Sequence, residues 1–444
     1  PTISFEVLLL KRVYASEVAK HHNKKVLVQG WVQETRDFGG IRFIILKDRS
    51  GYTQITIPKK LVPEDVFHAA ENLTKESVIF VWGTAKKSDK AKVGSEVIPE
   101  RIEIVSLANA PTPIDTSGKI KSDLSTRLDH RFLDIRNRKS IALFTIRSKM
   151  FKACVEYFDA NGFININTPK ITTIGVESGA ELFEVNYFGR KAYLAQSPQV
   201  YKQMFVAAGL ERVYEIAPVY RAEKSHTAQH LTEFIGIDFE QGFIESEQDV
   251  MDTVEGLIKH ILKRVKEECK EELELWGRKV NIPRKIPRIT MREAKKILAE
   301  KGLRLPEEED LNLEAQKILA DYFMEKEGTE LLFVYYYPWA VRPFYHMKPD
   351  DDPSVTKSFD LLWNGIEVAT GAQREHRYEV LKKQAQEKGV NFSAMKAYAE
   401  IFQYGCPPHG GTGLGLDRLL EAFMKLPNIR EGILLPRDPE RVTP

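Results

Sequence analysis

The sequence lacks the features of a membrane protein and of a disulfide-stapled domain. None of its 444 residues falls in an apolar run approaching the roughly 20 residues that span a bilayer. The leucine run at 8–10 is too short for a secretory signal core, so we expect a cytoplasmic protein. The three cysteines, Cys154, Cys269 and Cys406, lie far apart and form no C-x-x-C pair, which argues against a disulfide framework and a zinc site.

Two common nucleotide-binding fingerprints are also missing. The chain has no G-x-G-x-x-G and no G-x-x-x-x-G-K-[ST], so neither a Rossmann dinucleotide fold nor a P-loop is indicated. The net charge is only +2, although residues 1–107 are mildly basic, as suits contact with phosphates. The composition is that of an ordinary folded protein, 43% hydrophobic and 29% charged, and the length predicts two or three domains.

Residues 1–107 are rich in predicted β-structure. Five segments rich in Val, Ile, Phe and Trp are separated by glycine-containing turns, and a helical stretch at 64–73 lies between the third and fourth of them. This order predicts an OB-fold, a Greek-key barrel that often binds oligonucleotides, with another five-stranded barrel as the alternative. The predicted strands are 25–35, 40–47, 53–57, 78–86 and 96–107.

The rest of the chain predicts a linker and a larger α+β domain. Proline and glycine at 108–126 indicate a linker, and we place the hinge at 108–135. In residues 136–444 hairpin-like strand runs mix with helices without regular alternation, which favours a mainly antiparallel sheet flanked by helices. Residues 265–330 are charged and weakly patterned, and we expect a peripheral insertion there.

One segment of the larger domain pairs an arginine with a glutamate. In residues 217–240 a predicted strand puts Arg221 and Glu223 on one face, because side chains alternate with period two. An arginine there can clamp a phosphate or carboxylate with two hydrogen bonds. An ion pair on a solvated face is the plainer interpretation of this pair taken alone.

Two further segments combine charge with small residues. In residues 359–374 Glu367 interrupts an apolar strand, and its carboxylate can hold Mg²⁺ carried by nucleotide phosphates. An outward glutamate on an edge strand is the alternative. In residues 407–420 a glycine-rich turn precedes a helix predicted to begin near Leu414, with Arg418 in its first turns. Such a turn and helix suit anion binding.

Together and in this order, the segments resemble the signature motifs of class II aminoacyl-tRNA synthetases. Residues 147–169 resemble the first motif, 219–223 with 230–240 the second, and 411–418 the third. The resemblance covers nearly the whole chain, because an N-terminal OB barrel is the architecture of the aspartate, asparagine and lysine subgroup. The chain looks most like the archaeal and eukaryotic type of aspartyl-tRNA synthetase at GVESGAELF (175–183), AQSPQVYKQM (195–204) and LPRDPERVTP (435–444).

The resemblance implies a two-step reaction. ATP and Mg²⁺ activate L-aspartate to aspartyl-adenylate, and the aspartyl group then passes to the 3′ end of tRNA(Asp). The residues matching catalytic positions are Arg221, Glu367 and Arg418. The ATP site would also include Glu223, Gln229, His230, Leu231, Phe234, Gly415, Leu416 and Asp417, the metal would lie at Glu367 and Thr370, and aspartate would meet Glu177, Ser178, Gln199, Lys202, Arg221, Thr370 and Arg374, with Glu181 in the closing loop.

Substrate choice is expected to depend on two cations. Lys202 and Arg374 would converge on the side chain of the amino acid. A carboxylate satisfies both, whereas an amide would leave a buried lysine partly unpaired at a cost of about 1–3 kcal/mol. Asparaginyl enzymes typically carry an apolar residue at the position of Lys202. An asparaginyl enzyme, a barrel-less amide-forming paralogue and a non-catalytic RNA-binding paralogue are the alternatives.

The chain departs from the family pattern at three positions of the ATP site. Thr370 stands where serine is usual, Asp417 where glutamate is usual, and Gln229 where arginine is common. Each replacement keeps a polar group, so we expect an effect on affinity rather than loss of activity.

The barrel is expected to read the anticodon. By resemblance Phe43 would stack on the central base, for about 1–3 kcal/mol, and Gln54 and Glu96 would contact base edges. An aromatic residue in the barrel core is the alternative for Phe43. Relatives strict for tRNA(Asp) often combine a Trp at the position of Gln33 with a Lys at that of Lys92. Because this chain keeps only the lysine, we hypothesise that it also charges tRNA(Asn).

The first motif also predicts a homodimer. Its helix carries an apolar stripe, and the resemblance implies that an exposed stripe here, with Pro169, forms a two-fold interface. The stripe residues are Met150, Phe151, Cys154, Val155 and Phe158.

Overall fold

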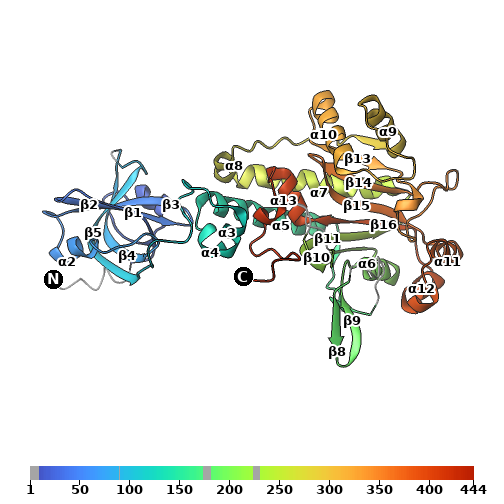
Figure 1. The fold of residues 1–444 in the computed structure, drawn as a ribbon, viewed down its shortest axis with the longest axis horizontal. Helices are drawn as coiled ribbons and strands as arrows, with labels where there is room; N and C mark the ends of the chain where they lie inside the picture. Colours follow the sequence, from blue (N-terminus) through green and yellow to red (C-terminus); the bar gives the residue numbers. More distant parts are fainter. Residues whose placement is uncertain (1–9, 90, 174–181, 224–230) are drawn as a thin grey trace. The chain divides into compact units, whose positions relative to one another are not determined.

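The chain forms two compact units in the computed structural model (Figure 1), which describes residues 10–89, 91–173, 182–223 and 231–444, apart from the side chains of 393 and 394. The units are Pro1–Ile141 and Ala142–Pro444, and the division falls in the first turn of helix α5 (Arg138–Ala160). Each unit buries an apolar core of its own. No helix in the described ranges is long and apolar enough to cross a membrane.

The first unit contains a closed five-stranded barrel with the strand order β1-β2-β3-β5-β4. β3 and β5 pair in parallel and close it, whereas the other neighbours are antiparallel. Alternate side chains such as Val28, Ile44 and Val81 fill the interior. The predicted barrel, with its helix between the third and fourth strands, is confirmed. Its elements are η1 (Ala15–His21), β1 (Lys25–Asp37), β2 (Ile41–Asp48), β3 (Gly51–Pro58), α2 (Glu64–Ala69), β4 (Val78–Lys87) and β5 (Ser95–Ser106).

The segment after the barrel is tied to it by a buried carboxylate. Residues 108–123 form no helix or strand, but Thr116 is buried and its hydroxyl donates to Glu76. Lys47 and Arg136 also donate to Glu76, at 2.5 and 3.0 Å. Burial opposes ionisation of Glu76, but these partners hold its pKa below the usual glutamate value. Two short helices, α3 (Leu124–Asp129) and α4 (Arg131–Asp134), complete the segment.

The second unit is organised around an eight-stranded sheet with the order β12-β13-β14-β15-β16-β11-β10-β6. The five inner pairs are antiparallel, and only the two end pairs are parallel. The predicted α+β domain with a mainly antiparallel sheet is confirmed. The strands are β6 (Ile164–Asn165), β10 (Arg212–Tyr220), β11 (Glu233–Gly242), β12 (Arg288–Thr290), β13 (Leu331–Tyr335), β14 (Ser358–Trp363), β15 (Ile366–Arg374) and β16 (His409–Gly415).

Four helices pack on one face of this sheet, and polar side chains gather on the other face of its central strands β11, β15 and β16. Apolar residues such as Met150, Leu257 and Phe423 pack with Ile237 and other inward strand residues in one core. The second-longest of the covering helices begins with a capping box at Ser246. Besides α5, the covering helices are α7 (Glu247–Glu268), α8 (Lys270–Trp276) and α13 (Leu416–Met424).

The remaining elements form three smaller apolar clusters and a projecting hairpin. The predicted insertion, 265–330, contributes α8, β12, α9 and α10, and α9 and α10 pack on β13 and β14. Figure 1 shows the β8–β9 hairpin extending away from the sheet. The elements are α9 (Met291–Glu300), α10 (Leu313–Glu327), α11 (Tyr378–Glu387), α12 (Lys396–Gln403), α6 (Gln199–Phe205), β7 (Ile171–Thr172), β8 (Glu184–Tyr187), β9 (Arg190–Leu194), and the short turns η2 (Val206–Leu210), η3 (Trp339–Val341), η4 (Phe392–Met395) and η5 (Ile429–Gly432).

The expectation of an exposed apolar stripe on the first-motif helix is wrong. Met150, Cys154 and Phe158 are fully buried, because α7 and the sheet pack against that side of α5. Of the stripe, Phe151 is exposed and Val155 is half-buried. Any subunit interface here must therefore use other side chains.

The expectation of a glycine-rich turn is also wrong. Residues His409–Gly415 form β16, a central strand, and the helix begins at Leu416 rather than near Leu414. Glycine is needed for close approach, since a Cβ at Gly411 would lie 2.1 Å from the carbonyl oxygen of Phe239.

Candidate active site

The polar face of the sheet carries a pocket of about 520 Å³, a size that suits a small-molecule ligand. Its walls come from β10, β11, β15, β16, the start of α13, the segment before α6 and residues 340–346. These elements are far apart in sequence and meet only in the fold. The predicted site residues that line the pocket are Gln199, Arg221, Glu223, Leu231, Phe234, Glu367, Thr370, Arg374, Gly415, Asp417 and Arg418.

Some predicted residues are not on the pocket wall. The side chain of Leu416 is buried in the core on the helix-covered face, and Lys202 lies behind the wall with 1% of its surface exposed. Five other predicted residues lie outside the part of the chain that the structure describes: Glu177, Ser178, Glu181, Gln229 and His230.

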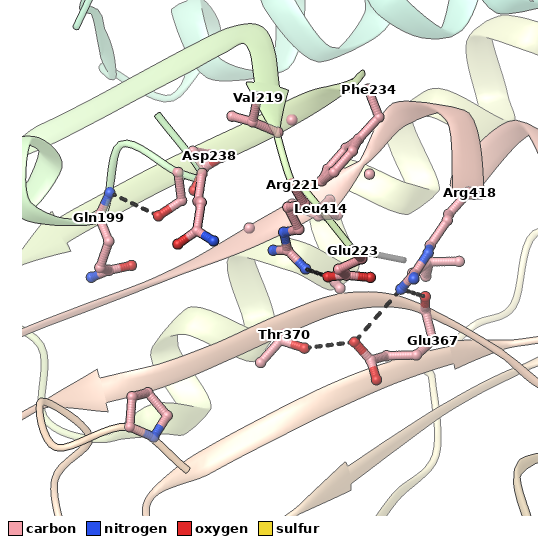
Figure 2. Close-up of a pocket in the computed structure, with 18 of the residues that line it drawn as sticks. Gln199, Val219, Arg221, Glu223, Phe234, Asp238, Glu367, Thr370, Leu414 and Arg418 are labelled. Atoms are coloured by element: carbon pink, nitrogen blue, oxygen red, sulfur yellow. Dashed lines mark hydrogen bonds and ion pairs between the residues drawn. The ribbon is translucent and has the colours of Figure 1, made fainter. Parts of the chain in front are cut away.

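At one end of the pocket an arginine faces an aromatic ring and a carboxylate. β10 ends at Tyr220, yet the backbone N–H of Arg221 still donates to Thr232 at 2.9 Å, which continues the ladder. The guanidinium carbon lies 5.4 Å from the Phe234 ring centre, and Nη1 lies 3.8 Å from Glu223 Oε1. Figure 2 shows these side chains directed into one space, which could hold a planar base and a phosphate.

Across from them, Glu367 lies between a hydroxyl and a second arginine (Figure 2). The hydroxyl of Thr370 donates to Glu367 Oε1 at 3.0 Å. Nη1 of Arg418 lies 3.9 Å from the same oxygen and donates to the backbone carbonyl of Glu367 at 3.2 Å. Because Thr370 O accepts from the Thr412 hydroxyl at 2.7 Å, the strand pair holds this group in place.

These oxygens fit a magnesium ion that arrives with a nucleotide. Mg²⁺ is usually held by one or two carboxylates plus phosphate oxygens and water. Glu367 is about one-third exposed, and Thr370 adds a hydroxyl beside it. No group of three or more His, Cys, Asp or Glu side chains in the described ranges forms a complete protein cage. The site therefore fits an ion whose other ligands are phosphates and water.

Asp417 has a supporting position. Its Oδ1 accepts from Arg147 Nη2 at 2.7 Å and its Oδ2 accepts from the backbone N–H of Ile235 at 3.0 Å. It joins α5, β11 and α13, so the aspartate in place of the usual glutamate still has two protein partners.

At the other end, two buried cations are already neutralised. Lys202 Nζ donates to Asp238 Oδ1 and to Thr412 O, both at 3.0 Å, and lies 3.4 Å from Glu240 Oε2. Arg374 Nε donates to Glu240 Oε1 at 2.9 Å. Burial opposes ionisation of Glu240, but Arg374 and Lys202 hold its pKa below the usual value. The expectation that an amide substrate would leave Lys202 partly unpaired is therefore wrong, because three protein oxygens already surround its Nζ.

Donors nevertheless remain at this end. Gln199 Nε2 is buried on the pocket wall without a partner among the described residues. Arg374 Nη2 is used by Glu240 and Gly411 O, and one Nη1 hydrogen goes to His346 Nε2 at 2.9 Å. The second Nη1 hydrogen of Arg374 has no acceptor in the described part of the chain. A ligand group that only accepts hydrogen bonds, such as a carboxylate, can satisfy these donors.

The sequence did not single out Asp238, Glu240, Arg342 or His346. The two acids alternate with apolar residues in β11, so carboxylates in an otherwise buried strand were the available signal. Arg342 lines the pocket, pairs with Asp360 at 2.5 Å and lies 3.8 Å over the Tyr337 ring. Nothing local in the sequence marks Arg342 or His346.

The barrel brings its predicted residues to the outer face of neighbouring strands. Phe43 faces Thr56 across β2 and β3 and is not in the barrel core. Thr56 accepts from Gln54 Nε2 at 3.0 Å and donates to Glu96 Oε2 at 2.7 Å. This face suits stacking and polar contact with bases.

The two residues linked to tRNA choice differ in setting. Gln33 lies where the register of β1 against β2 shifts, a bulge that re-aims a side chain. Its Oε1 is buried without a partner in the described ranges, whereas Lys92 is exposed.

The pocket, the sheet and the barrel together match one class of protein. Residues 123–439 match the family of tRNA synthetases class II (D, K and N), and residues 26–105 match the OB-fold nucleic acid binding domain. The chain belongs to this class II synthetase family.

Comparison with individual proteins shows which members of this family the chain resembles. The chain is 48% identical to the aspartate–tRNA(Asp) ligase of Pyrococcus abyssi, over 98% of this chain and 100% of the relative. It is 47% identical to the aspartate–tRNA(Asp/Asn) ligase of Methanopyrus kandleri, with the same coverage. Among solved structures, the asparaginyl-tRNA synthetase of Pyrococcus horikoshii with asparaginyl-adenylate aligns with a TM-score of 0.92, 32% identity, and coverage of 98% and 100%.

Two glycines of β16 provide a matched test of how closely this strand approaches β11. A Cβ at Gly411 would meet Phe239 O at 2.1 Å and Glu240 Oε2 at 2.2 Å, whereas at Gly413 its nearest contact is Asp238 Oδ1 at 3.2 Å. We expect Gly411→Ala to lower the free energy of unfolding by about 2–3 kcal/mol and Gly413→Ala by less than about 1 kcal/mol. Urea unfolding followed by tryptophan fluorescence measures both, and equal stability of the two variants would contradict the contact argument.

Proposed function

We propose that this chain activates L-aspartate with ATP and transfers it to tRNA(Asp), with tRNA(Asn) as a second acceptor. The observation that carries the proposal is the pocket itself. A guanidinium, an aromatic ring and a solvent-accessible carboxylate stand at one end. At the other end stand donors of Gln199 and Arg374 that have no acceptor in the part of the chain that the structure describes. The aspartate ligases with nearly half of their residues identical to this chain support the choice of amino acid.

At the nucleotide end the proposed roles follow from charge and shape. Phe234 stacks on adenine, Glu223 accepts from its amino group, and Arg221 neutralises the α-phosphate. Arg418 meets the outer phosphates. Mg²⁺, held through Glu367 and Thr370, supplies charge neutralisation on the phosphates.

At the amino-acid end the proposed roles follow from hydrogen bonding. Asp238 attracts the α-ammonium group, and Gln199 Nε2 and Arg374 Nη1 donate to carboxylate oxygens. Lys202 acts from behind the wall by fixing Asp238 and Glu240. Roles for Glu177, Ser178, Glu181, Gln229 and His230 stay predictions from the resemblance.

The reaction then requires positioning more than proton transfer. The α-carboxylate attacks the α-phosphorus, the bond to the bridging oxygen of pyrophosphate breaks, and aspartyl-adenylate forms. The terminal hydroxyl of the tRNA then attacks the aspartyl carbonyl and AMP leaves. Arg221 and Arg418 stabilise charge in line with the attack, so no general base is needed in the first step. We place this reaction in the cytoplasm, where its substrates are.

Pyrophosphate exchange with ATP tests the amino acid. We expect exchange with aspartate and not with asparagine or lysine, and a loss of about 100-fold or more in kcat for Arg221→Ala, because a transition-state contact is removed. Phe243→Ala, an exposed change on the same unit, serves as the control. Exchange with asparagine in place of aspartate would assign the chain to the sister specificity, and silence with all three would favour the non-catalytic alternative.

Charging of the two tRNAs tests the acceptor. With Gln33 at the bulge and Lys92 exposed, we expect kcat/KM on tRNA(Asp) and tRNA(Asn) to agree within about tenfold, a difference of only about 1.4 kcal/mol. Gln33→Trp should lower charging of tRNA(Asn) more than that of tRNA(Asp). A wild-type preference above about a hundredfold for tRNA(Asp) would contradict the proposal that tRNA(Asn) is a second acceptor.

We also propose a two-fold homodimer through the edge of the sheet. β6 is the terminal strand of the sheet. Its Ile164 is 47% exposed, and Phe151 on α5 is 39% exposed. An exposed edge with apolar side chains favours pairing with a second copy. Light scattering at micromolar concentration should give twice the chain mass and fall toward the chain mass for Ile164→Asp, with Phe243→Asp as the control. A wild-type monomer would contradict the proposal.

A further inference from the structure

His346 is a buried histidine on the wall of the pocket that the sequence did not mark. It is 2% exposed, and its ring lies at the amino-acid end, where Nε2 is 2.9 Å from Arg374 Nη1. A guanidinium can only donate, so Nε2 must be the acceptor and must carry no proton. The contact therefore fixes one tautomer of a neutral ring, with the proton on Nδ1.

The surroundings keep this ring neutral. Burial is the largest influence and the charge of Arg374 the second, and together they hold the pKa of His346 well below the usual value. The other cations that lower it are Arg342, Lys202 and Lys388. A second positive charge against Arg374 is thereby avoided.

The backbone holds the ring beside Arg374 from both sides. His346 forms a bridge with Arg374 at the end of β15, and Met347 N–H donates to Gln373 O at 3.0 Å. From α11, the side chain of Gln384 donates to the carbonyl oxygens of Phe344 at 2.6 Å and His346 at 3.0 Å. The loop cannot move away without breaking these bonds.

We infer that His346 is a positioning residue for aspartate recognition: it accepts one Nη1 hydrogen of Arg374 and leaves the other to the substrate. Glu240 and Gly411 O fix the opposite edge of the same guanidinium. With His346 on the remaining nitrogen, every Arg374 donor but one has an acceptor among the described residues, and the plane of the group is set before the amino acid binds. The inference rests on the proposed function, since it assigns Arg374 to the aspartate end.

Three substitutions separate the two ring nitrogens. The amide oxygen of glutamine reaches the place of Nε2, whereas the amide of asparagine reaches only that of Nδ1, and leucine offers neither. In pyrophosphate exchange we expect His346→Leu to raise the KM for aspartate about 10- to 100-fold while the KM for ATP changes less than about twofold. His346→Gln should return the KM for aspartate to within about threefold of wild type, and His346→Asn should resemble the leucine variant.

The control is His260→Gln on α7, on the helix-covered face, which should leave both KM values unchanged. An unchanged KM for aspartate in His346→Leu would overturn the inference, as would rescue by asparagine but not by glutamine, which would make Nδ1 the acting group. If the leucine variant does not fold, the comparison of glutamine with asparagine decides alone. Absence of aspartate-dependent exchange in the wild type would overturn the proposed function and this inference with it.

Discussion

The site depends on Glu240, a fully buried carboxylate that two cations share. Arg374 reaches it from β15 and Lys202 from α6, while Glu240 itself is on β11. Removing one partner of a buried ion pair typically lowers the free energy of unfolding by about 3–5 kcal/mol, because the remaining charge is buried without a partner and without hydration. This one carboxylate therefore fixes three elements and makes the amino-acid end of the pocket rigid.

That rigidity requires glycine in the neighbouring strand. Gly411 lies directly opposite Glu240, and Gly413 lies opposite Asp238. Any side chain at the first of these positions would occupy the space of the carboxylate. The ion pairs and the glycine strand are thus parts of one arrangement, in which β16 approaches β11 closely enough for the acids to project over it.

The same arrangement changes how selectivity should be explained. If Lys202 were a bare cation, its charge alone would select a carboxylate. Because it is neutralised by Asp238 and Glu240, we propose that selection uses the hydrogens of Gln199 and Arg374 that have no acceptor among the described residues. Such donors discriminate by geometry, since an amide nitrogen turned toward them offers no lone pair.

The two ends of the pocket differ in exposure, which matches the sizes of their proposed ligands. The side chains of Arg221 and Arg418 are 40% and 32% exposed, whereas that of Arg374 is 3% exposed. The nucleotide end can admit a large ligand with its own water and metal. The side chains at the amino-acid end are largely buried, so each hydrogen bond there counts for more.

The sequence by itself determined the architecture and eleven of the residues that line the pocket. Period-two patterning and turn residues were sufficient for the barrel, and co-occurring motifs identified Arg221, Glu223, Glu367 and Arg418, because these signals depend on neighbours in the chain. Only the tertiary structure decided that the glycine segment is a central strand and that the helix stripe is buried, since both depend on what packs against them. It also decided that Lys202 is already paired and that His346 lies beside Arg374. Each of these contacts joins residues from 28 to 210 positions apart, and no local pattern encodes a partner at that separation.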